Sequence, residues 1–343
     1  MTNQTTFDYR AASNAILADL KRDRDRQVIA KRFGFDLAKR QTLEKIGQTF
    51  DITRERVRQI EKSTLQKLST SKHDELKAAN VALVELIEKE GGVAPAADVA
   101  KSLGAKEFGD QAYIMFLASL ASDILVVSED DNTRAVLALN SKYDAKKIHE
   151  LLKATIQTVR EIGKPVRLQD LHKKLADHNL SAEELSSLTK INKHLANLDK
   201  HWGLLNWPQV NPKSIRDKAY LVLVGHGKPL HFTEIADKIK NSNFRRRDVT
   251  VQAVHNELIK DKRFILIGRG IYALSEWGYT PGTVADIIAE VLKREAPLHK
   301  DEIIKRVLVK RQVRTTTIVL NLQEKSQFVR VAKATYTLKE PLV

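Results

Sequence analysis

The chain has 343 residues, a formal net charge of +15 and no cysteine, which excludes a disulfide framework and a thiolate metal site. Its first twenty residues lack the apolar core of a secretory signal, and its longest apolar runs, such as residues 219–224, are too short to span a bilayer. The excess of lysine and arginine favours a polyanionic partner. We therefore expect a cytoplasmic protein with several cores of ordinary size and no membrane contact.

Residues 24–68 have the pattern of a helix-turn-helix. The helical pattern is interrupted at residues 51–53, and Thr53 is predicted to cap the helix that follows. Thr42 is predicted to cap the preceding helix, whose first amides could hold a DNA phosphate. The apolar side of the second helix is expected at Val57, Ile60, Thr64 and Leu68, spaced by three and four residues.

The other side of the second helix carries base-reading chemistry. Arg54, Arg58 and Lys62 form one row, and Glu55 and Gln59 form a second row beside it. Arginine can pair with guanine through two hydrogen bonds, glutamine can do the same with adenine, and glutamate can accept from cytosine. Taken alone, the same pattern also fits a solvated face on a surface helix.

The order of residues in this segment resembles region 4 of the bacterial primary sigma factors. That domain reads the upstream (minus-35) promoter element and sits on the flap of RNA polymerase. The resemblance covers about residues 20–70 and rests on the stretches Arg32–Asp36, Thr42–Gly47 and Thr53–Glu61. It implies that Arg54, Glu55, Arg58 and Gln59 approach bases, and that Thr42, Leu43, Arg56 and Lys62 lie near phosphates.

The chain also departs from a working sigma factor. Such a factor needs an aromatic-rich helical region that captures and melts the downstream promoter element. Nothing before residue 20 fits that region, and aromatic residues make up only 6% of the chain. We therefore do not expect this chain to open promoters alone.

From about residue 73 the chain is internally repeated. Each predicted unit has an amphipathic helix, a turn marked by glycine or proline, two further helices and a short strand pair. The turns lie at residues 91–95, 163–166, 227–230 and 295–298. The closing segments lie at residues 124–139, 202–205, 264–274 and 328–338. Gly268, Arg269 and Gly270 are predicted to form the hairpin turn of the third unit.

Three helices followed by a hairpin follow the winged-helix plan. Residues from about 214 to 277 resemble the HARE-HTH family at residues 219–220, 227–230, 232–236 and 263–274. That family includes the delta subunit of Gram-positive RNA polymerase and modules fused to DNA-modifying enzymes. The resemblance implies a part in transcription or chromatin, and it leaves open whether this face touches DNA or protein.

The predicted fold class is mainly α, a helix-turn-helix domain followed by tandem winged-helix domains with small β-hairpin wings. The predicted domains are residues 1–72, 73–142, 143–210, 211–278 and 279–343. The turn at residues 206–212, which contains two prolines, is the expected hinge.

Charge distinguishes the winged-helix units from one another. Residues 76–145 have more acidic than basic side chains, so we discount the first unit as a DNA contact. The third and fourth units have arginines beside the third helix or at the wing, which suit phosphates better than bases, although a solvated loop would look the same. The candidates for DNA contact are Arg245, Arg246, Arg247, Arg269, Arg311 and Arg314.

No enzyme signature is present in the sequence. Gly225, Gly227 and Lys228 are followed by Pro229 and not by the Ser or Thr of a phosphate-binding loop. The ten histidines are scattered and form no metal-binding spacing. We expect a protein that is not an enzyme and that needs no cofactor or metal.

Three functional hypotheses follow. The first is a nucleoid-associated bacterial transcription regulator that binds promoter-like double-stranded DNA, with winged helices adding contacts to phosphates or to RNA polymerase. The second is a polymerase accessory subunit that docks on the flap without reading sequence. The third is the DNA-targeting subunit of a restriction or modification system. The target site, the sign of regulation and the oligomeric state stay open.

Overall fold

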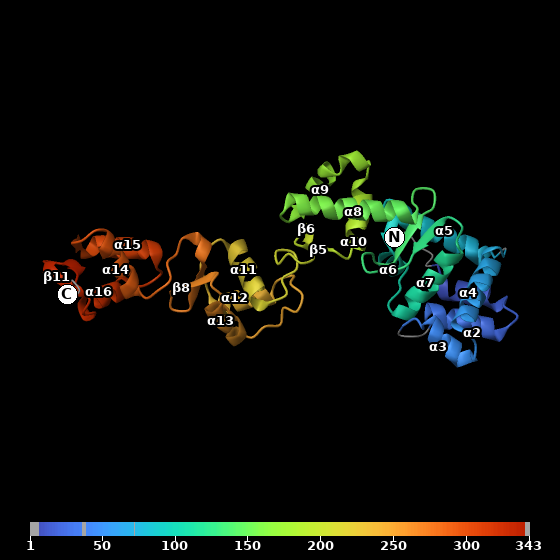
Figure 1. Cartoon of the computed structure of the whole chain (residues 1–343), viewed down its shortest axis with the longest axis horizontal. Helices are drawn as coiled ribbons and strands as arrows, with labels where there is room; N and C mark the ends of the chain where they lie inside the picture. Colours follow the sequence, from blue (N-terminus) through green and yellow to red (C-terminus); the bar gives the residue numbers. More distant parts are fainter. Residues whose placement is uncertain (1–6, 36–38, 72, 340–343) are drawn as a thin grey trace, which may run out of the picture. The chain divides into compact units, whose positions relative to one another are not determined.

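The computed structural model describes residues 7–339 except 36–38 and 72, and it divides into two compact units, Met1–Asn206 and Trp207–Val343 (Figure 1). The division falls at the start of the predicted hinge. The described residues form sixteen α-helices and twelve short strands, so the fold is mainly α, as predicted. None of the described helices combines the length and the apolar character that crossing a bilayer requires.

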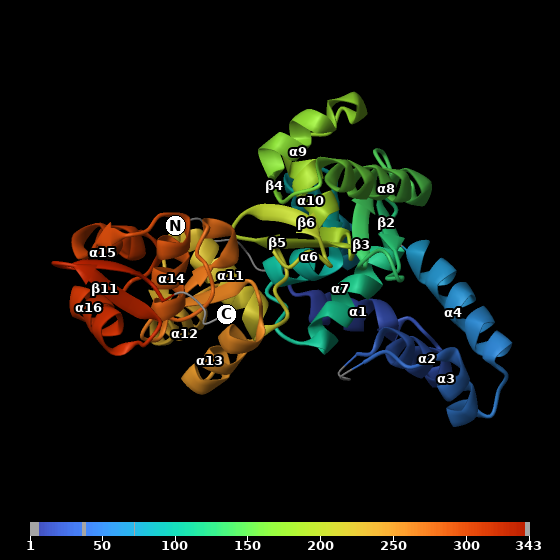
Figure 2. The same ribbon diagram turned by 60° about the vertical axis from the view of Figure 1, so that its left-hand side comes forward.

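The first unit begins with four helices, and the predicted helix-turn-helix is present in them. The helices are α1 (Tyr9–Ala18), α2 (Asp23–Phe33), α3 (Leu43–Phe50) and α4 (Arg54–Ser69). Val57 and Ile60 of α4 share a small core with Val28 of α2 and Ile46 of α3. Helices α2, α3 and α4 therefore lie side by side, as both ribbon views show (Figures 1 and 2).

Local signals set the ends of the helix-turn-helix. The hydroxyl oxygen of Thr42 accepts a hydrogen bond from the amide of Lys45 at 3.2 Å, and that of Thr53 accepts one from the amide of Arg56 at 3.1 Å. Both predicted N-caps are thus confirmed. The predicted apolar side of α4 is buried at Val57, Ile60, Thr64 and Leu68.

The rest of the chain forms four winged helices, each with three α-helices and a three-stranded antiparallel sheet. The order of strands in each sheet is first, third, second: β1-β3-β2, β4-β6-β5, β7-β9-β8 and β10-β12-β11. The predicted closing hairpins supply two strands of each sheet. The remaining strand was not predicted. It is two or three residues long and lies in the turn that glycine or proline marks, where an apolar residue after the turn pairs with the last strand.

Two winged helices belong to the first unit. The first contains α5 (Asp74–Lys89), β1 (Val93–Pro95), α6 (Ala96–Ser102), α7 (Phe108–Leu120), β2 (Ile124–Val127) and β3 (Val136–Leu139). The second contains α8 (Ala145–Ile162), β4 (Val166–Arg167), α9 (Leu168–Lys174), a 3-10 turn (Ala176–His178), α10 (Ala182–Ile191), β5 (Leu195–Leu198) and β6 (His201–Leu204).

The other two winged helices form the second unit. The third contains α11 (Ile215–His226), β7 (Leu230–His231), α12 (Phe232–Lys240), α13 (Val251–Lys260), β8 (Phe264–Gly268), β9 (Ile271–Leu274) and a 3-10 turn (Ser275–Trp277). The fourth contains α14 (Val284–Arg294), β10 (Leu298–His299), α15 (Lys300–Lys310), α16 (Thr315–Glu324), β11 (Phe328–Ala332) and β12 (Thr335–Leu338). The turn between β8 and β9 is the predicted one.

The predicted boundary at residues 72 and 73 lies inside one continuous core. Ile16 of α1 and Leu68 of α4 pack in the same cluster as Leu83 of α5 and Phe116 of α7. A second cluster joins Val93 of the first winged helix to Leu151 of the second. The first unit is therefore one packed body, and its helix-turn-helix is supported by the winged helix that follows it.

An ion pair reinforces the contact between α1 and α7. The carboxylate of Asp110 accepts hydrogen bonds from the amides of Lys106 and Glu107 and from Arg10, the shortest to Arg10 at 2.6 Å. These bonds, first of all the one from the Lys106 amide, lower the pKa of Asp110 to about 2. The charged form of Asp110 therefore stabilises the folded unit.

We expect Asp110→Asn to lower the free energy of unfolding at pH 7 by about 1–2 kcal/mol, because it keeps an acceptor oxygen but loses the charge that Arg10 binds. Because the folded pKa lies below the unfolded one, this contribution is complete above about pH 4 and is lost as the pH falls towards 2. Urea unfolding followed between pH 2 and 7 measures it. Asp74→Asn is the control, since Asp74 and Lys77 pair in solvent, and a similar effect in both variants would contradict the prediction.

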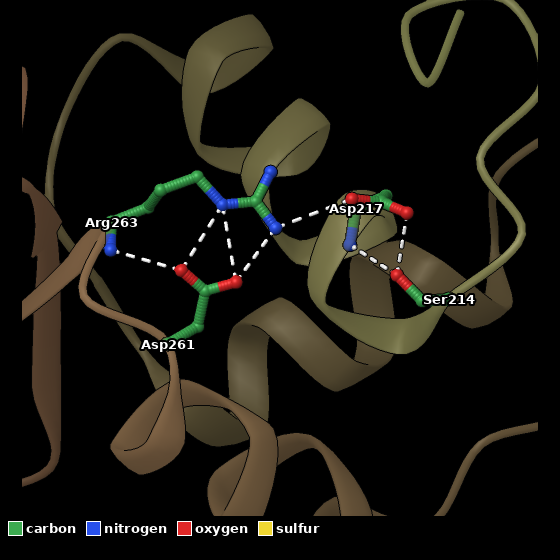
Figure 3. A network of polar contacts seen from close by, with 4 residues as sticks. All are labelled: Ser214, Asp217, Asp261 and Arg263. Atoms are coloured by element: carbon green, nitrogen blue, oxygen red, sulfur yellow. Dashed lines mark hydrogen bonds and ion pairs between the residues drawn. The ribbon is translucent and has the colours of Figure 1, made fainter. Parts of the chain in front are cut away.

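In the second unit, Arg263 connects the start of β8 to the start of α11 (Figure 3). Its guanidinium lies 2.7 Å from a carboxylate oxygen of Asp261 and 3.2 Å from one of Asp217. The hydroxyl of Ser214 caps α11 by accepting from the Asp217 amide at 3.1 Å. This network holds the hairpin of the third winged helix against its first helix.

Candidate nucleic-acid interface

The turn between α3 and α4 sets the angle at which α4 is presented. Asp51 adopts a left-handed conformation with φ of 52°, and the amide of Ile52 donates to the carbonyl of Gly47 at 3.0 Å. A Cβ atom on Gly47 would lie 2.6 Å from the carbonyl oxygen of Ile52. Only glycine fits at residue 47 without moving the turn.

We expect Gly47→Ala to destabilise the first unit by about 1–3 kcal/mol, because the added methyl group overpacks the turn against backbone that cannot yield. The control is Gly225→Ala in the exposed last turn of α11, where a Cβ meets nothing within 4 Å. That change should stabilise the protein by about 0.5–1 kcal/mol, since alanine favours a helix over glycine. Thermal unfolding of both variants measures the two effects. A neutral Gly47→Ala would show that the turn can shift.

The predicted reading residues form an exposed face on α4. Arg54, Glu55, Arg58, Gln59 and Lys62 are all solvent-exposed, on the side opposite the buried apolar residues. The structure thus brings together in one face the five side chains that the sequence placed in two rows.

Several of these side chains bind one another in the free protein. Arg58 donates to both carboxylate oxygens of Glu55, at 2.9 and 2.6 Å, and Arg56 donates to the amide oxygen of Gln59 at 3.3 Å. The hydrogen bonds with Arg58 lower the pKa of Glu55 and those with Glu55 raise the pKa of Arg58. Both partners of this ion pair are 56% exposed, so water can replace it at little cost.

The residues expected near phosphates divide into two kinds. Thr42, Arg56 and Lys62 are exposed, and Thr42 caps the N-terminus of α3. Leu43 packs its side chain against the core of the helix-turn-helix, so only its backbone amide, in the first turn of α3, is free for such a role.

An open hollow of about 590 Å³ lies at the turn, between α3 and the start of α4. Besides Arg54 and Arg56 it is lined by Gln48, which was not among the predicted site residues. The missed signal is the i, i+4 spacing of Glu44 and Gln48 on the exposed side of α3. Of the residues in the sigma-like stretches, Asp36 lies outside the described residues.

In the third winged helix, the predicted arginine cluster lies in the loop before α13. Arg245, Arg246 and Arg247 are exposed, and Arg247 donates to the carbonyl of Ser242 at 3.1 Å. The loop is held from below by Lys218, a 3% exposed residue whose ammonium donates to the carbonyl of Arg246 at 2.8 Å. Burial lowers the pKa of Lys218. Arg269 is exposed in the turn between β8 and β9, the predicted wing tip.

The fourth winged helix corrects one assignment. Arg311 was expected to contact phosphate, but it is only 4% exposed. Its guanidinium donates to the carbonyls of Leu266, Thr280 (at 2.9 Å) and Gly282. Arg311 therefore bonds the loop before α16 to β8 and to the linker, and no phosphate can take the place of these carbonyls. Arg314 is exposed at the N-terminus of α16, as expected.

Comparison with known proteins matches two separate parts of the chain. The family "Sigma-70, region 4" matches residues 17–70, and the family HARE-HTH, described as a "restriction endonuclease HTH domain", matches residues 213–277. The first match contains the exposed face of α4. The second contains the loop at residues 245–247 and the wing tip at Arg269.

Curated relatives match the N-terminal part alone. The RNA polymerase sigma factor SigA of Nostoc sp. is 42% identical over 69 residues, which are 18% of this chain and 18% of that protein. The RNA polymerase sigma factor SigA1 of Synechococcus elongatus is 53% identical over 45 residues, which are 13% of this chain and 11% of that protein. The chain thus spans less than a fifth of the length of these relatives.

The matched families point to DNA binding and to transcription by RNA polymerase as the general area of function. The chain contains a sigma-70 region 4 domain at residues 17–70 and a HARE-HTH domain at residues 213–277.

Proposed function

We propose that this protein is a bacterial transcription regulator that reads a promoter-like element in double-stranded DNA through the exposed face of α4. The winged helices of the second unit add contacts to phosphates or to RNA polymerase. The protein acts in the cytoplasm, on the nucleoid, and it is not an enzyme.

One observation carries the proposal: the exposed face of α4 presents arginine, glutamate and glutamine side chains from a rigid helix-turn-helix. These are the side chains that discriminate base pairs in the major groove. Their partners in the free protein are exposed and are each other, so DNA can replace those bonds without leaving a buried group unsatisfied.

Selection from a randomised duplex library near physiological salt tests the proposal. We expect the retained duplexes to share a short motif similar to the upstream promoter element. Retention without any shared motif would remove the base-reading role of α4.

The second candidate is an accessory subunit of RNA polymerase that docks on the flap. Two observations favour it: the match to sigma-70 region 4 and the excess of acidic residues at positions 76–145, which makes the first winged helix a poor DNA contact. Co-purification with core polymerase after nuclease treatment, together with a library selection that yields no motif, is the result that this candidate predicts.

The third candidate is the DNA-targeting subunit of a restriction or modification system. It is favoured by the HARE-HTH match, because the description of that family includes restriction endonucleases. Co-purification with an endonuclease or a methyltransferase that depends on this chain for its target would support it over the other two.

A further inference from the structure

The third and fourth winged helices meet at a tightly packed seam. The amide of Gln312, in the loop before α16, donates to the carbonyl of Ile267 in β8 at 3.0 Å. A Cβ atom on Gly268 would lie 2.5 Å from the carbonyl oxygen of Gln312. With the three bonds of Arg311, these contacts fix the wing of one winged helix against the loop of the next.

An open groove of about 760 Å³ runs along this seam. Three arginines line it: Arg269 from the wing tip, Arg311 from the seam and Arg314 from the start of α16. All of its lining residues are described, and none is an aspartate or a glutamate. The groove therefore has a positive potential, and neither winged helix forms it alone.

The start of α16 adds donors to the groove. Arg314 occupies the N-cap position and makes no capping bond with its side chain, unlike the Thr250 hydroxyl at the equivalent place before α13. Thr315 and Thr316 are exposed in the first turn, and Thr317 lines the groove. Amides without a side-chain cap at a helix start suit the oxygens of a phosphate.

Arg311 supplies an independent reason for an anion at this place. It is buried to more than nine-tenths, and no carboxylate of the described residues forms an ion pair with it. Its Nε has no hydrogen-bond partner among the described residues. Asp286, whose charge acts on Arg311, is occupied by the amide and hydroxyl of Thr283. An anion bound in the groove would balance this buried charge.

We propose that the seam groove binds a backbone phosphate of double-stranded DNA between Arg269 and Arg314, with the first amides of α16 as further donors. The choice of DNA as the source of the phosphate rests on the proposed function. The site depends on the packing of two winged helices, so it belongs to the whole second unit and not to the HARE-HTH domain.

Binding of the full-length protein to a short labelled duplex without a promoter motif, titrated at several salt concentrations, tests the site. Each of Arg269→Ala and Arg314→Ala should lower the slope of log affinity against log salt by about 1, and the double variant by about 2. Lys325→Ala is the matched control, because Lys325 is an exposed cation at the opposite end of α16. Equal slopes for the double variant, the control and the wild type would overturn the proposal.

Hydrogen exchange of the amides at residues 315–317 separates the possible sources of phosphate. We expect the duplex to slow exchange there in the wild type and not in the double variant. If inorganic phosphate slows exchange while the duplex does not, the groove is a site for free phosphate and the assignment to DNA is wrong.

The same titration on an Arg58→Ala, Gln59→Ala background keeps this inference apart from the proposed function. If α4 does not read bases, the library selection yields no motif, but the groove variants still change the salt slope. If the groove is wrong, the motif is selected and the slope stays unchanged.

Discussion

Arg58→Ala and Gln59→Ala are each expected to weaken binding to the selected duplex by about 1–3 kcal/mol. The reason is that arginine and glutamine make paired hydrogen bonds with guanine and adenine, and a methyl group leaves those base atoms unsatisfied. Arg58→Ala also frees the carboxylate of Glu55, which would then repel nearby phosphates. Titration of each variant against the selected duplex and a scrambled one measures the effect.

Two controls separate reading from charge. Lys67→Ala removes an exposed cation from the last turn of α4, so it should change affinity for both duplexes to the same small extent. The reading variants should lose affinity mainly for the selected duplex. An equal loss on scrambled DNA would reduce the face of α4 to a phosphate contact.

Arg311→Met is expected to lower the free energy of unfolding of the second unit by about 2–4 kcal/mol. Methionine fills similar space but leaves the carbonyls of Leu266, Thr280 and Gly282 without their donor, and each unsatisfied buried carbonyl costs about 1–3 kcal/mol. Release of a buried charge offsets part of this cost, since burial lowers the pKa of Arg311. Urea unfolding, with hydrogen exchange of β8 to locate the change, measures it.

Arg294→Met is the matched control for this variant. Arg294 is 73% exposed and pairs with Glu290 on the surface of α14, so its loss should change stability by less than about 0.5 kcal/mol. If both variants have the same stability, the carbonyls around Arg311 find other donors and the seam does not depend on it.

Most of the helix-turn-helix could be predicted from local pattern. Thr42 and Thr53 were predicted as N-caps, and the spacing of Val57, Ile60, Thr64 and Leu68 predicted the buried side of α4. Once one side of a helix is buried, the opposite side is exposed by geometry, so the reading face at residues 54–62 follows from the same pattern.

The packing between domains could not be predicted in this way. A helix pattern predicts that a face is buried but not which partner buries it, and α1, α5 and α7 meet in one core across the predicted boundary at residues 72 and 73. The short strands β1, β4, β7 and β10 were missed for a related reason, because two or three residues become a strand only by pairing with a distant hairpin.

Arg311 and Arg314 show where the sequence stops. Both are arginines in the same short basic segment, and both were assigned to phosphate. The sequence by itself determined the helix ends, the wing turn and the face of α4, because these depend on neighbours within a few residues. Only the tertiary structure decided that Arg311 is buried among three carbonyls while Arg314 faces a groove, since burial depends on how the preceding winged helix packs against this loop.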